Sequence, residues 1–234
     1  MKSTTVMVKT NDFSESWSLV VYAAMHHGIT IPADETPNAP LCKDISLITE
    51  LSGNAIQQIK DRQFHPLYPQ QKGVDAYVKQ FNPTISECVN ILDPYTGFDY
   101  TYYERLFLHH LQMYKIIDNF HPYNRRLQGT TWIPEKDLFS YESVPCLQRI
   151  SMRNYGDGTC EITFTWRSRD LYKAYQMNLV GLINAILPQI EEKYGIECVK
   201  ITDRVDYAHV YEDDWEIAKQ IPVNMRDVHN KIML

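Results

Sequence analysis

Apolar and polar residues alternate, fully or in part, along several stretches of this chain, and a period of two is typical of β-strands with one buried face. This pattern predicts strands over residues 4–10, 42–51, 129–134, 147–155, 159–168 and 197–211. Gly156, Asp157 and Gly158 separate the fourth strand from the fifth, and a turn of this composition favours a β-hairpin. Two paired strands are therefore expected after residue 146.

Apolar residues at helical spacing predict the remaining elements. The predicted helices cover residues 17–28, 54–62, 100–120, 171–195 and 213–221. Residues 100–120 contain no proline and are expected to form one helix, whereas Pro188 should kink or break the helix at 171–195. The last helix is expected to be short and capped, and to precede a polar tail.

The order of strands and helices predicts an α+β fold in which long helices pack on a mixed β-sheet. A chain of 234 residues, 44% of them hydrophobic, can build one sizeable core, so we expect residues 1–234 to form a single domain. The chain contains no run of about 18 apolar residues, and residues 1–13 are too polar for a signal peptide. We therefore expect a cytoplasmic protein without a membrane partner.

Charge and cysteine content narrow the possible functions. The formal net charge of -6 argues against binding of nucleic acid, which draws on many basic residues on one face. The five cysteines include no CxxC pair, so we expect free thiols and no metal site. The first sixty residues contain no arginine, whereas six arginines lie between residues 125 and 169. Such a concentration suits a small anion such as phosphate, although the same arginines could solvate the face of a strand.

Cys146 follows a proline and lies within this arginine-rich region. A thiol reacts as the thiolate, and nearby cations lower its pKa toward that form. Cys146 is therefore a candidate nucleophile for an anionic heterocyclic substrate. The alternative is a buried apolar role, which is the commoner one for a free cysteine.

Five motifs occur in order around Cys146. They are NRR (124–126), VPCLQ (144–148), WRSRD (166–170), Asn178, which lies eleven residues after Arg167, and DYAHVY (206–211). Together they resemble the thymidylate synthase family over roughly residues 100–215. The stretch FDYTYYERLF and the VPCLQ motif are particularly similar to the short archaeal and phage-type members.

The resemblance implies a nucleotide site in which Cys146 is the nucleophile that adds to C6 of the pyrimidine. Arg167 would bind the nucleotide phosphate and lie close enough to the sulfur to favour the thiolate, and Ser168 would add a hydrogen bond to the phosphate. Arg125 and Arg126 match a pair that reaches the phosphate in the partner subunit. The resemblance therefore also implies a homodimer.

The remaining matches concern the base, the sugar and the co-substrate. Asn178 matches the amide that reads the O4 and N3 edge of uracil, where members acting on cytosine carry an aspartate. His209 and Tyr211 match the pair that holds the sugar 3′-hydroxyl. Asp170 matches the acid that contacts the pterin and orders a water network, and Gln148 lies in the nucleophile loop.

Proton transfer at C5 is implied less directly. Tyr100 and Arg105 fit the spacing of a tyrosine and an arginine in an upstream family motif, and Tyr100 is a candidate for the network that removes the C5 proton. Long family members also use a glutamate to order the proton-transfer waters. Glu50 and Glu104 are the candidates for it in this chain.

The chain departs from the family pattern at three places. No arginine precedes Arg62, so the arginine-rich phosphate loop of bacterial members is missing and fewer groups, or lysines, must hold the phosphate. Leu147 stands where the bacterial form has a histidine. Residues 230–234, NKIML, lack the usual sequence of the tail that shields the intermediate from water.

The resemblance implies a methyltransferase that converts dUMP to dTMP, with 5,10-methylenetetrahydrofolate or methylene-tetrahydromethanopterin as the one-carbon donor. Addition of water in place of hydride would make 5-hydroxymethyl-dUMP, and the residues do not distinguish the two products. A member that binds the nucleotide without turning it over is a further alternative. A cysteine hydrolase would need Cys146 and His209 within hydrogen-bond reach, whereas the resemblance assigns His209 to the sugar.

Overall fold

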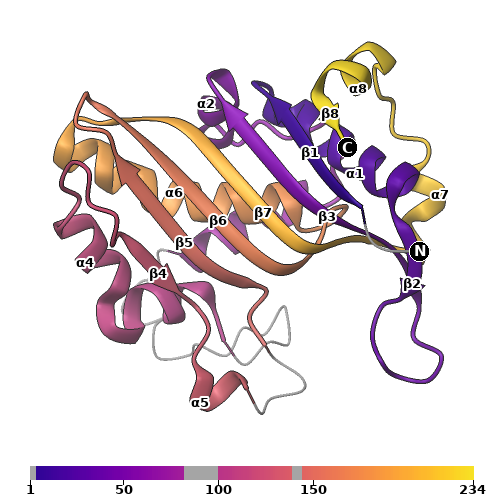
Figure 1. Ribbon diagram of the computed structural model, residues 1–234, viewed down its shortest axis with the longest axis horizontal. Helices are drawn as coiled ribbons and strands as arrows, with labels where there is room; N and C mark the ends of the chain where they lie inside the picture. Colours follow the sequence, from indigo (N-terminus) through magenta and orange to yellow (C-terminus); the bar gives the residue numbers. More distant parts are fainter. Residues whose placement is uncertain (1–3, 82–99, 139–143) are drawn as a thin grey trace.

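A mixed β-sheet organises the molecule, and helices cover one of its faces (Figure 1). The computed structural model describes residues 4–81, 100–138 and 144–234. Eight strands are present in these ranges. They are β1 (Thr5–Thr10), β2 (Ile29–Pro32), β3 (Leu41–Ser52), β4 (Gln128–Thr130), β5 (Leu147–Asn154), β6 (Thr159–Asp170), β7 (Glu197–Tyr211) and β8 (Ile232–Met233).

The strand order is β4-β5-β6-β7-β3-β1-β8, and β2 pairs with β3 beside this path. Strands β6 and β7 run parallel, as do β1 and β3, whereas β3 is antiparallel to β7 and β5 is antiparallel to β6. The expected hairpin is therefore present as β5 and β6. The α+β fold with a mixed sheet and packed helices is confirmed.

The helices lie on one side of the sheet and bury its apolar face. They are α1 (Phe13–His27), α2 (Asn54–Lys60), α3 (Val74–Lys79), α4 (Gln112–Asp118), α5 (Pro134–Asp137), α6 (Tyr175–Tyr194), α7 (Trp215–Ala218) and α8 (Met225–Lys231). Figure 1 shows α6 crossing behind β6 and β7. Trp17 of α1, Phe164 and Trp166 of β6 and Leu182 of α6 are fully buried between the layers. None of the described helices is long and apolar enough to span a membrane.

Local sequence explains both ends of α1. The Asp12 side chain accepts a hydrogen bond from the backbone N–H of Glu15 at 2.9 Å, which caps the first turn. At the other end, a Cβ on Gly28 would lie 2.3 Å from the carbonyl oxygen of Ala24. Only glycine therefore allows the chain to leave the helix at this point and enter β2.

The expected single helix over residues 100–120 is wrong. The chain forms a π-helical turn over Glu104–Leu108 and a short turn over His109–Leu111, and α4 begins only at Gln112. His110 and Leu111 have positive φ angles of 57° and 51°. The Gln112 side chain donates to the carbonyls of Arg105 and Thr130, each at 2.9 Å. It thereby satisfies a carbonyl that the interrupted helix leaves without its usual partner.

The expected break at Pro188 does not occur, because α6 runs through it, and the alternative of a kink stays a prediction. Pro188 is exposed, so the helix carbonyl that lacks its usual N–H partner there can be solvated. The helix begins at Tyr175, four residues later than expected, because Asp170 holds the preceding turn. The Asp170 carboxylate accepts hydrogen bonds from the backbone N–H groups of Tyr172 and Lys173 at 2.8 and 3.0 Å.

The expected capped helix and polar tail need correction. The carboxylate of Asp214 precedes α7 but makes no capping hydrogen bond, and it forms an ion pair with Lys173 at 2.7 Å instead. The expected tail contains α8 and β8, and β8 pairs with β1 at the edge of the sheet. The strand expected over residues 129–134 is shorter, since β4 ends at Thr130 and α5 begins at Pro134.

Candidate functional site

The expected site residues gather at the end of the sheet where β6 and β7 finish and β5 begins. Cys146 directly precedes β5, and the backbone N–H of Arg167 near the end of β6 donates to its carbonyl at 2.9 Å. Asp170, the last residue of β6, pairs in register with His209 of β7. Tyr211 is the last residue of β7, and its hydroxyl interacts electrostatically with Asp170 and Cys146.

Two side chains hold the loop that carries Cys146. Arg167 donates through Nε to the carbonyl of Pro145 at 3.1 Å and through Nη2 to the carbonyl of Val144 at 2.8 Å. Gln148 donates through Nε2 to the same Pro145 carbonyl at 2.6 Å. The arginine thus supports the nucleophile loop and keeps its Nη1 donors for other partners.

The pKa of the Cys146 thiol reflects opposing effects. Burial raises the pKa, whereas the positive charges of Arg167 and Arg169 lower it, and burial outweighs them. The cations act in the direction that the sequence predicted, but the net shift is upward. Cys146 is therefore mainly a neutral thiol at pH 7.

Two tyrosines border the nucleophile loop. The buried Tyr100 hydroxyl lies 3.5 Å from the carbonyl of Val144, and burial raises its pKa. The Tyr102 hydroxyl accepts a hydrogen bond from the backbone N–H of Leu147 at 3.2 Å. Arg105 lies over the Tyr100 ring, 5.4 Å from its centre, and so contacts the site through that ring.

His209 presents a buried acceptor. Its Nδ1 lies 3.2 Å from the carbonyl of Tyr207 and 3.5 Å from the hydroxyl of Ser168. A carbonyl can only accept, so Nδ1 carries the proton and Nε2 carries the lone pair. Burial lowers the pKa of His209, although Asp170 opposes the shift. Within the described part of the chain, Nε2 has no hydrogen-bond partner, which suits a ligand that donates a proton, such as a hydroxyl group.

Asp170 and Tyr211 complete this side of the site. Burial raises the pKa of Asp170, and the two backbone N–H groups that it accepts oppose the shift. The ring of Tyr211 meets the ring of His209 edge-on, with 4.6 Å between ring centres. Burial raises the pKa of Tyr211, and the neighbouring Asp170 raises it further. The structure therefore brings Cys146, Arg167, Ser168, Asp170, His209 and Tyr211 together.

Asn178 lies in the first turn of α6 and is buried. Its Nδ2 donates a hydrogen bond to the hydroxyl of Tyr77 on α3 at 2.7 Å. The Tyr77 hydroxyl in turn interacts electrostatically with Tyr100. Asn178 thus connects to the nucleophile loop through a tyrosine that none of the sequence motifs includes.

Several expected residues lie outside this cluster. Arg125 and Arg126 are exposed in the loop before β4. Glu50 forms an ion pair with Lys9 at 2.9 Å and lies six residues along β3 from Asp44, the pairing partner of His209. The other candidate, Glu104, lies in the same turn as Arg105.

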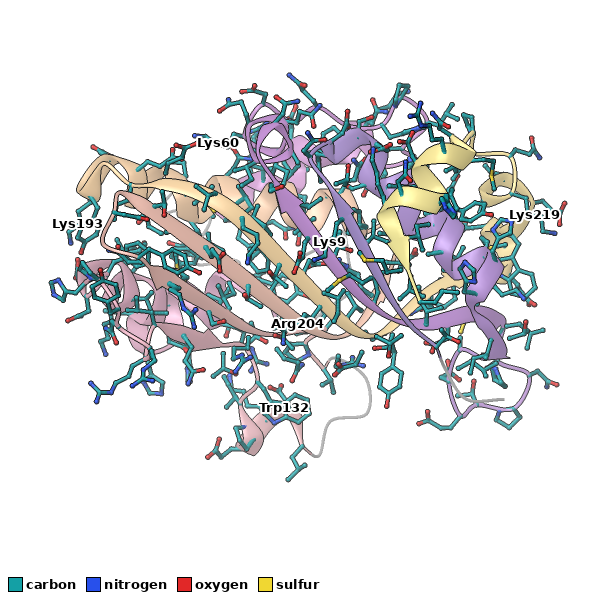
Figure 2. The ribbon with its side chains drawn as sticks, turned by 45° about the horizontal axis from the view of Figure 1, so that its top comes forward. Lys9, Lys60, Trp132, Lys193, Arg204 and Lys219 are labelled. Carbon is teal, nitrogen blue, oxygen red and sulfur yellow. The ribbon has the colours of Figure 1, made fainter. Side chains whose placement is uncertain are left out.

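The helix-free face of the sheet carries further charges. The register across β1, β3 and β7 aligns Lys9, Glu50 and Thr202 on one side, and Arg204 follows two residues later in β7. Figure 2 shows Lys9 and Arg204 over this part of the sheet. Of the six arginines of residues 125–169, four lie on β5 and β6 and two in the loop before β4, and Arg167 and Arg169 are the ones that lower the pKa of Cys146.

Arg169 was not assigned a role by the motifs, and it is buried behind the site. It donates through Nη1 to Asp203 at 3.1 Å, and Trp166 donates to the same carboxylate oxygen at 2.8 Å. Its guanidinium also lies over the rings of Trp166 and Tyr175, at 4.5 and 4.8 Å from their centres.

The cysteines that the structure describes form no disulfide bond. Cys42, Cys146, Cys160 and Cys198 are free, and Cys88 lies outside the described ranges. No group of three or more histidine, cysteine or acidic side chains within the described ranges could hold a metal ion. His209 makes no hydrogen bond to Cys146, so the pairing that a cysteine hydrolase requires is not formed.

Comparisons with known proteins bear on the family of the chain. No protein-family model matches the chain. A Methanopyrus kandleri protein named "Putative thymidylate synthase" is 28% identical over 218 residues, which cover 91% of this chain and 96% of that protein. A protein of the same name from Methanosarcina barkeri is 27% identical over 92% of this chain and 94% of its own length. One from Methanosarcina acetivorans is 36% identical over 43% of this chain and 45% of its own. These similarities suggest a thymidylate synthase-like family.

Proposed function

We propose that this protein is a thymidylate synthase-type transferase that converts dUMP to dTMP with a methylene-pterin as the one-carbon donor. The observation that carries the proposal is the cluster at the end of β6 and β7, where the Cys146 thiol, the Arg167 cation and the buried acceptor of His209 lie together. A nucleophile, a phosphate ligand and a sugar ligand are the three groups that this substrate needs. The names of the archaeal relatives point in the same direction.

The chemistry begins at Cys146. Its thiol gives up a proton, and the sulfur forms a bond to C6 of uracil while the C5–C6 π electrons move toward O4. The carbon nucleophile created at C5 accepts the one-carbon unit, and C5 then loses its proton. Expulsion of the pterin and transfer of its hydride to the new methylene carbon release the cysteine and leave dTMP and an oxidised dihydropterin. The pterin supplies both the carbon unit and the hydride.

The site residues support binding of each part of dUMP. Arg167 uses two of its donors on the loop carbonyls and retains Nη1 for the phosphate, which Ser168 would also contact. Asn178 has a donor and an acceptor for the O4 and N3 edge of uracil. His209 offers Nε2 to the 3′-hydroxyl, and the Tyr211 hydroxyl lies on the same side.

The surroundings of Asp170 fit a reduced pterin. Its side chain is half-buried, and two backbone N–H groups hold the carboxylate in place. A fixed carboxylate is the acceptor that the amino and ring N–H groups of a pterin require. Both a folate and a methanopterin present this edge, so the proposal covers both donors.

A homodimer is part of the proposal. The sheet buries one face against helices, while the opposite face carries Lys9, Glu50 and Arg204. Arg125 and Arg126 are exposed and, within the described ranges, form no ion pair. Two copies packed through the helix-free faces could each lend these arginines to the other copy's phosphate.

The decisive experiment combines trapping with product analysis. The full-length protein is incubated with 5-fluoro-dUMP and 5,10-methylenetetrahydrofolate, and in parallel with the methanopterin donor, and the Cys146 peptide is analysed by mass spectrometry. We expect a covalent adduct at Cys146 in the wild type and none in Cys146→Ser. Absence of an adduct with both donors would overturn the proposal.

The product formed from dUMP itself identifies the reaction. We expect a nucleotide heavier than dUMP by one methylene group, together with release of the C5 hydrogen. A product heavier by a methylene group and an oxygen atom would replace methylation with hydroxymethylation. Binding of dUMP without turnover, and equally well by Cys146→Ser, would identify a non-catalytic nucleotide-binding protein.

A further inference from the structure

Tyr77 contributes a hydroxyl group at the uracil end of the site. It lies on α3, is half-buried and accepts the hydrogen bond from Nδ2 of Asn178 at 2.7 Å. Burial raises the pKa of this hydroxyl, so it stays protonated throughout the neutral range. A short contact between a neutral hydroxyl and a buried amide limits how that amide can turn.

The packing of α3 on α6 explains why the hydroxyl lies there. A Cβ on Gly181 would come within 2.6 Å of the Tyr77 ring and 2.7 Å of the Phe81 ring. Gly181 follows Asn178 by three residues, which places both on the same side of α6. The two rings also meet each other edge-on, with 5.3 Å between centres. The missing side chain at Gly181 therefore seats Tyr77 against the helix with its hydroxyl at Asn178.

The contact has a chemical consequence for base recognition. The Asn178 amide has two N–H groups and one carbonyl oxygen. In the orientation that the structure shows, Tyr77 accepts one N–H of Asn178, and the other N–H and the carbonyl remain as a donor and an acceptor. This order matches uracil, whose O4 accepts and whose N3–H donates, and it opposes cytosine, in which both roles are reversed.

We propose that Tyr77 is a positioning residue that orients the Asn178 amide and thereby determines preference for uracil over cytosine. The inference rests on the proposed function, since it assigns a role within the same nucleotide site. Tyr77 acts through Asn178 and makes no contact with the reacting carbon atoms in this account.

The test uses Tyr77→Phe in the full-length protein, because this change removes the hydroxyl and keeps the ring. We expect kcat/KM for dUMP to fall about tenfold, the value of one hydrogen bond to a buried group. We expect the ratio of dUMP to dCMP affinity to fall by a similar factor, since a freely turning amide can serve either base. Tyr114→Phe, at a 40% exposed position on α4, is the matched control and should change neither quantity.

A double-mutant cycle with Asn178→Ala separates positioning from packing. If Tyr77 acts through the amide, Tyr77→Phe should have almost no further effect on the dUMP to dCMP ratio once Asn178 is gone. An unchanged ratio in Tyr77→Phe, or an equal loss in both backgrounds, would overturn the assignment. If the wild type binds neither nucleotide, the proposed function fails first, and the role of Tyr77 fails with it.

Discussion

Cys146, the proposed nucleophile, lies close to two cations and still keeps its proton at neutral pH. The positive charges of Arg167 and Arg169 lower the pKa of its thiol, but burial outweighs them and keeps that pKa above its ordinary value. Arg167 donates hydrogen bonds to the carbonyls of Val144 and Pro145. The neutral thiol protects the free protein from unwanted alkylation and oxidation, since the thiolate is the reactive form.

This balance predicts the pH dependence of alkylation at Cys146. The rate of reaction with iodoacetamide should rise with pH and reach its midpoint above the ordinary thiol pKa. Arg167→Gln removes a cation that stabilises the thiolate, so the pKa should rise further and the rate at pH 8 should fall about three- to tenfold. Mass spectrometry of the Cys146 peptide provides the measurement.

Arg149→Gln is the matched control for that experiment. Arg149 is an exposed arginine on β5, and its loss changes the net charge by the same amount. Its rate should remain close to that of the wild type. A faster reaction in Arg167→Gln would show that the arginine acts on the loop structure and not on the charge of the sulfur.

Residues that carry motifs could be predicted from the sequence, whereas their structural neighbours could not. Cys146, Arg167 and His209 belong to short sequence motifs of recognisable chemistry, and the structure brings them to one end of the sheet. Tyr77 and Tyr102 act through hydrogen bonds to residues far along the chain, at Asn178 and Leu147. The local sequence around a tyrosine does not reveal which distant group its hydroxyl will meet.

Among the elements, the segment around His110 shows where helical periodicity misleads. Apolar spacing over residues 100–120 is helical, but His110 and Leu111 adopt the left-handed conformation. The hydrogen bonds from Gln112 to Arg105 and Thr130 replace part of the helical pattern and connect the segment to β4. Contact with the sheet therefore outweighs the local preference for a continuous helix.

A glycine at position 110 should stabilise the protein. His110 is exposed and has φ of 57°, a conformation that costs side-chain-bearing residues about 1 kcal/mol and costs glycine much less. We expect His110→Gly to raise the free energy of unfolding by about 0.5–1 kcal/mol. Urea denaturation monitored by circular dichroism measures the change.

Lys115→Gly, in the same segment, should instead lower the free energy of unfolding. Lys115 is exposed within α4, where glycine is expected to cost about 1 kcal/mol. A destabilising effect of both substitutions would contradict the assigned left-handed turn at His110. Opposite signs would support it without any assumption about the rest of the protein.

Strands were predicted more accurately than helices for a physical reason. Alternation along β5 and β6 reflects one buried and one more exposed face, a property of the strand itself. The course of α6 through Pro188 depends instead on the surroundings, which tolerate the missing N–H. The pairing of β8 with β1 could not be predicted, because two residues carry no periodic signal.

At the scale of the whole molecule, the exposed Arg125 and Arg126 make the proposed dimer testable through shared sites. If they serve the partner's phosphate, a mixed dimer of one Cys146→Ser subunit and one Arg126→Ala subunit carries both defects in the same site. The other site then keeps an intact cysteine and an intact arginine. Random mixing should then place one intact site in about half of the dimers and restore about a quarter of wild-type activity. Activity after subunit exchange is the measurement.

The control pairs Cys146→Ser with Arg167→Ala, since both residues belong to the same site of one subunit. Mixing these two variants should restore nothing, because every site in the mixed dimer lacks one of them. A sedimentation measurement that finds only monomers, or no regain of activity despite subunit exchange, would contradict the shared-site arrangement.

The pairing of β3 with β7 has a consequence for the order of events during synthesis. Cys42 pairs with Tyr211 and Ser52 pairs with Lys200. Strand β3 is therefore synthesised long before β7, the strand with which it pairs. Until β7 leaves the ribosome, one edge of β3 stays open, and contacts of such long sequence separation form slowly. Cys146 is translated well before His209, yet the two become neighbours only when β7 docks. A nascent chain stalled before β7 would therefore contain Cys146 without His209 and Tyr211, and the proposed site would form only once the whole sheet is assembled.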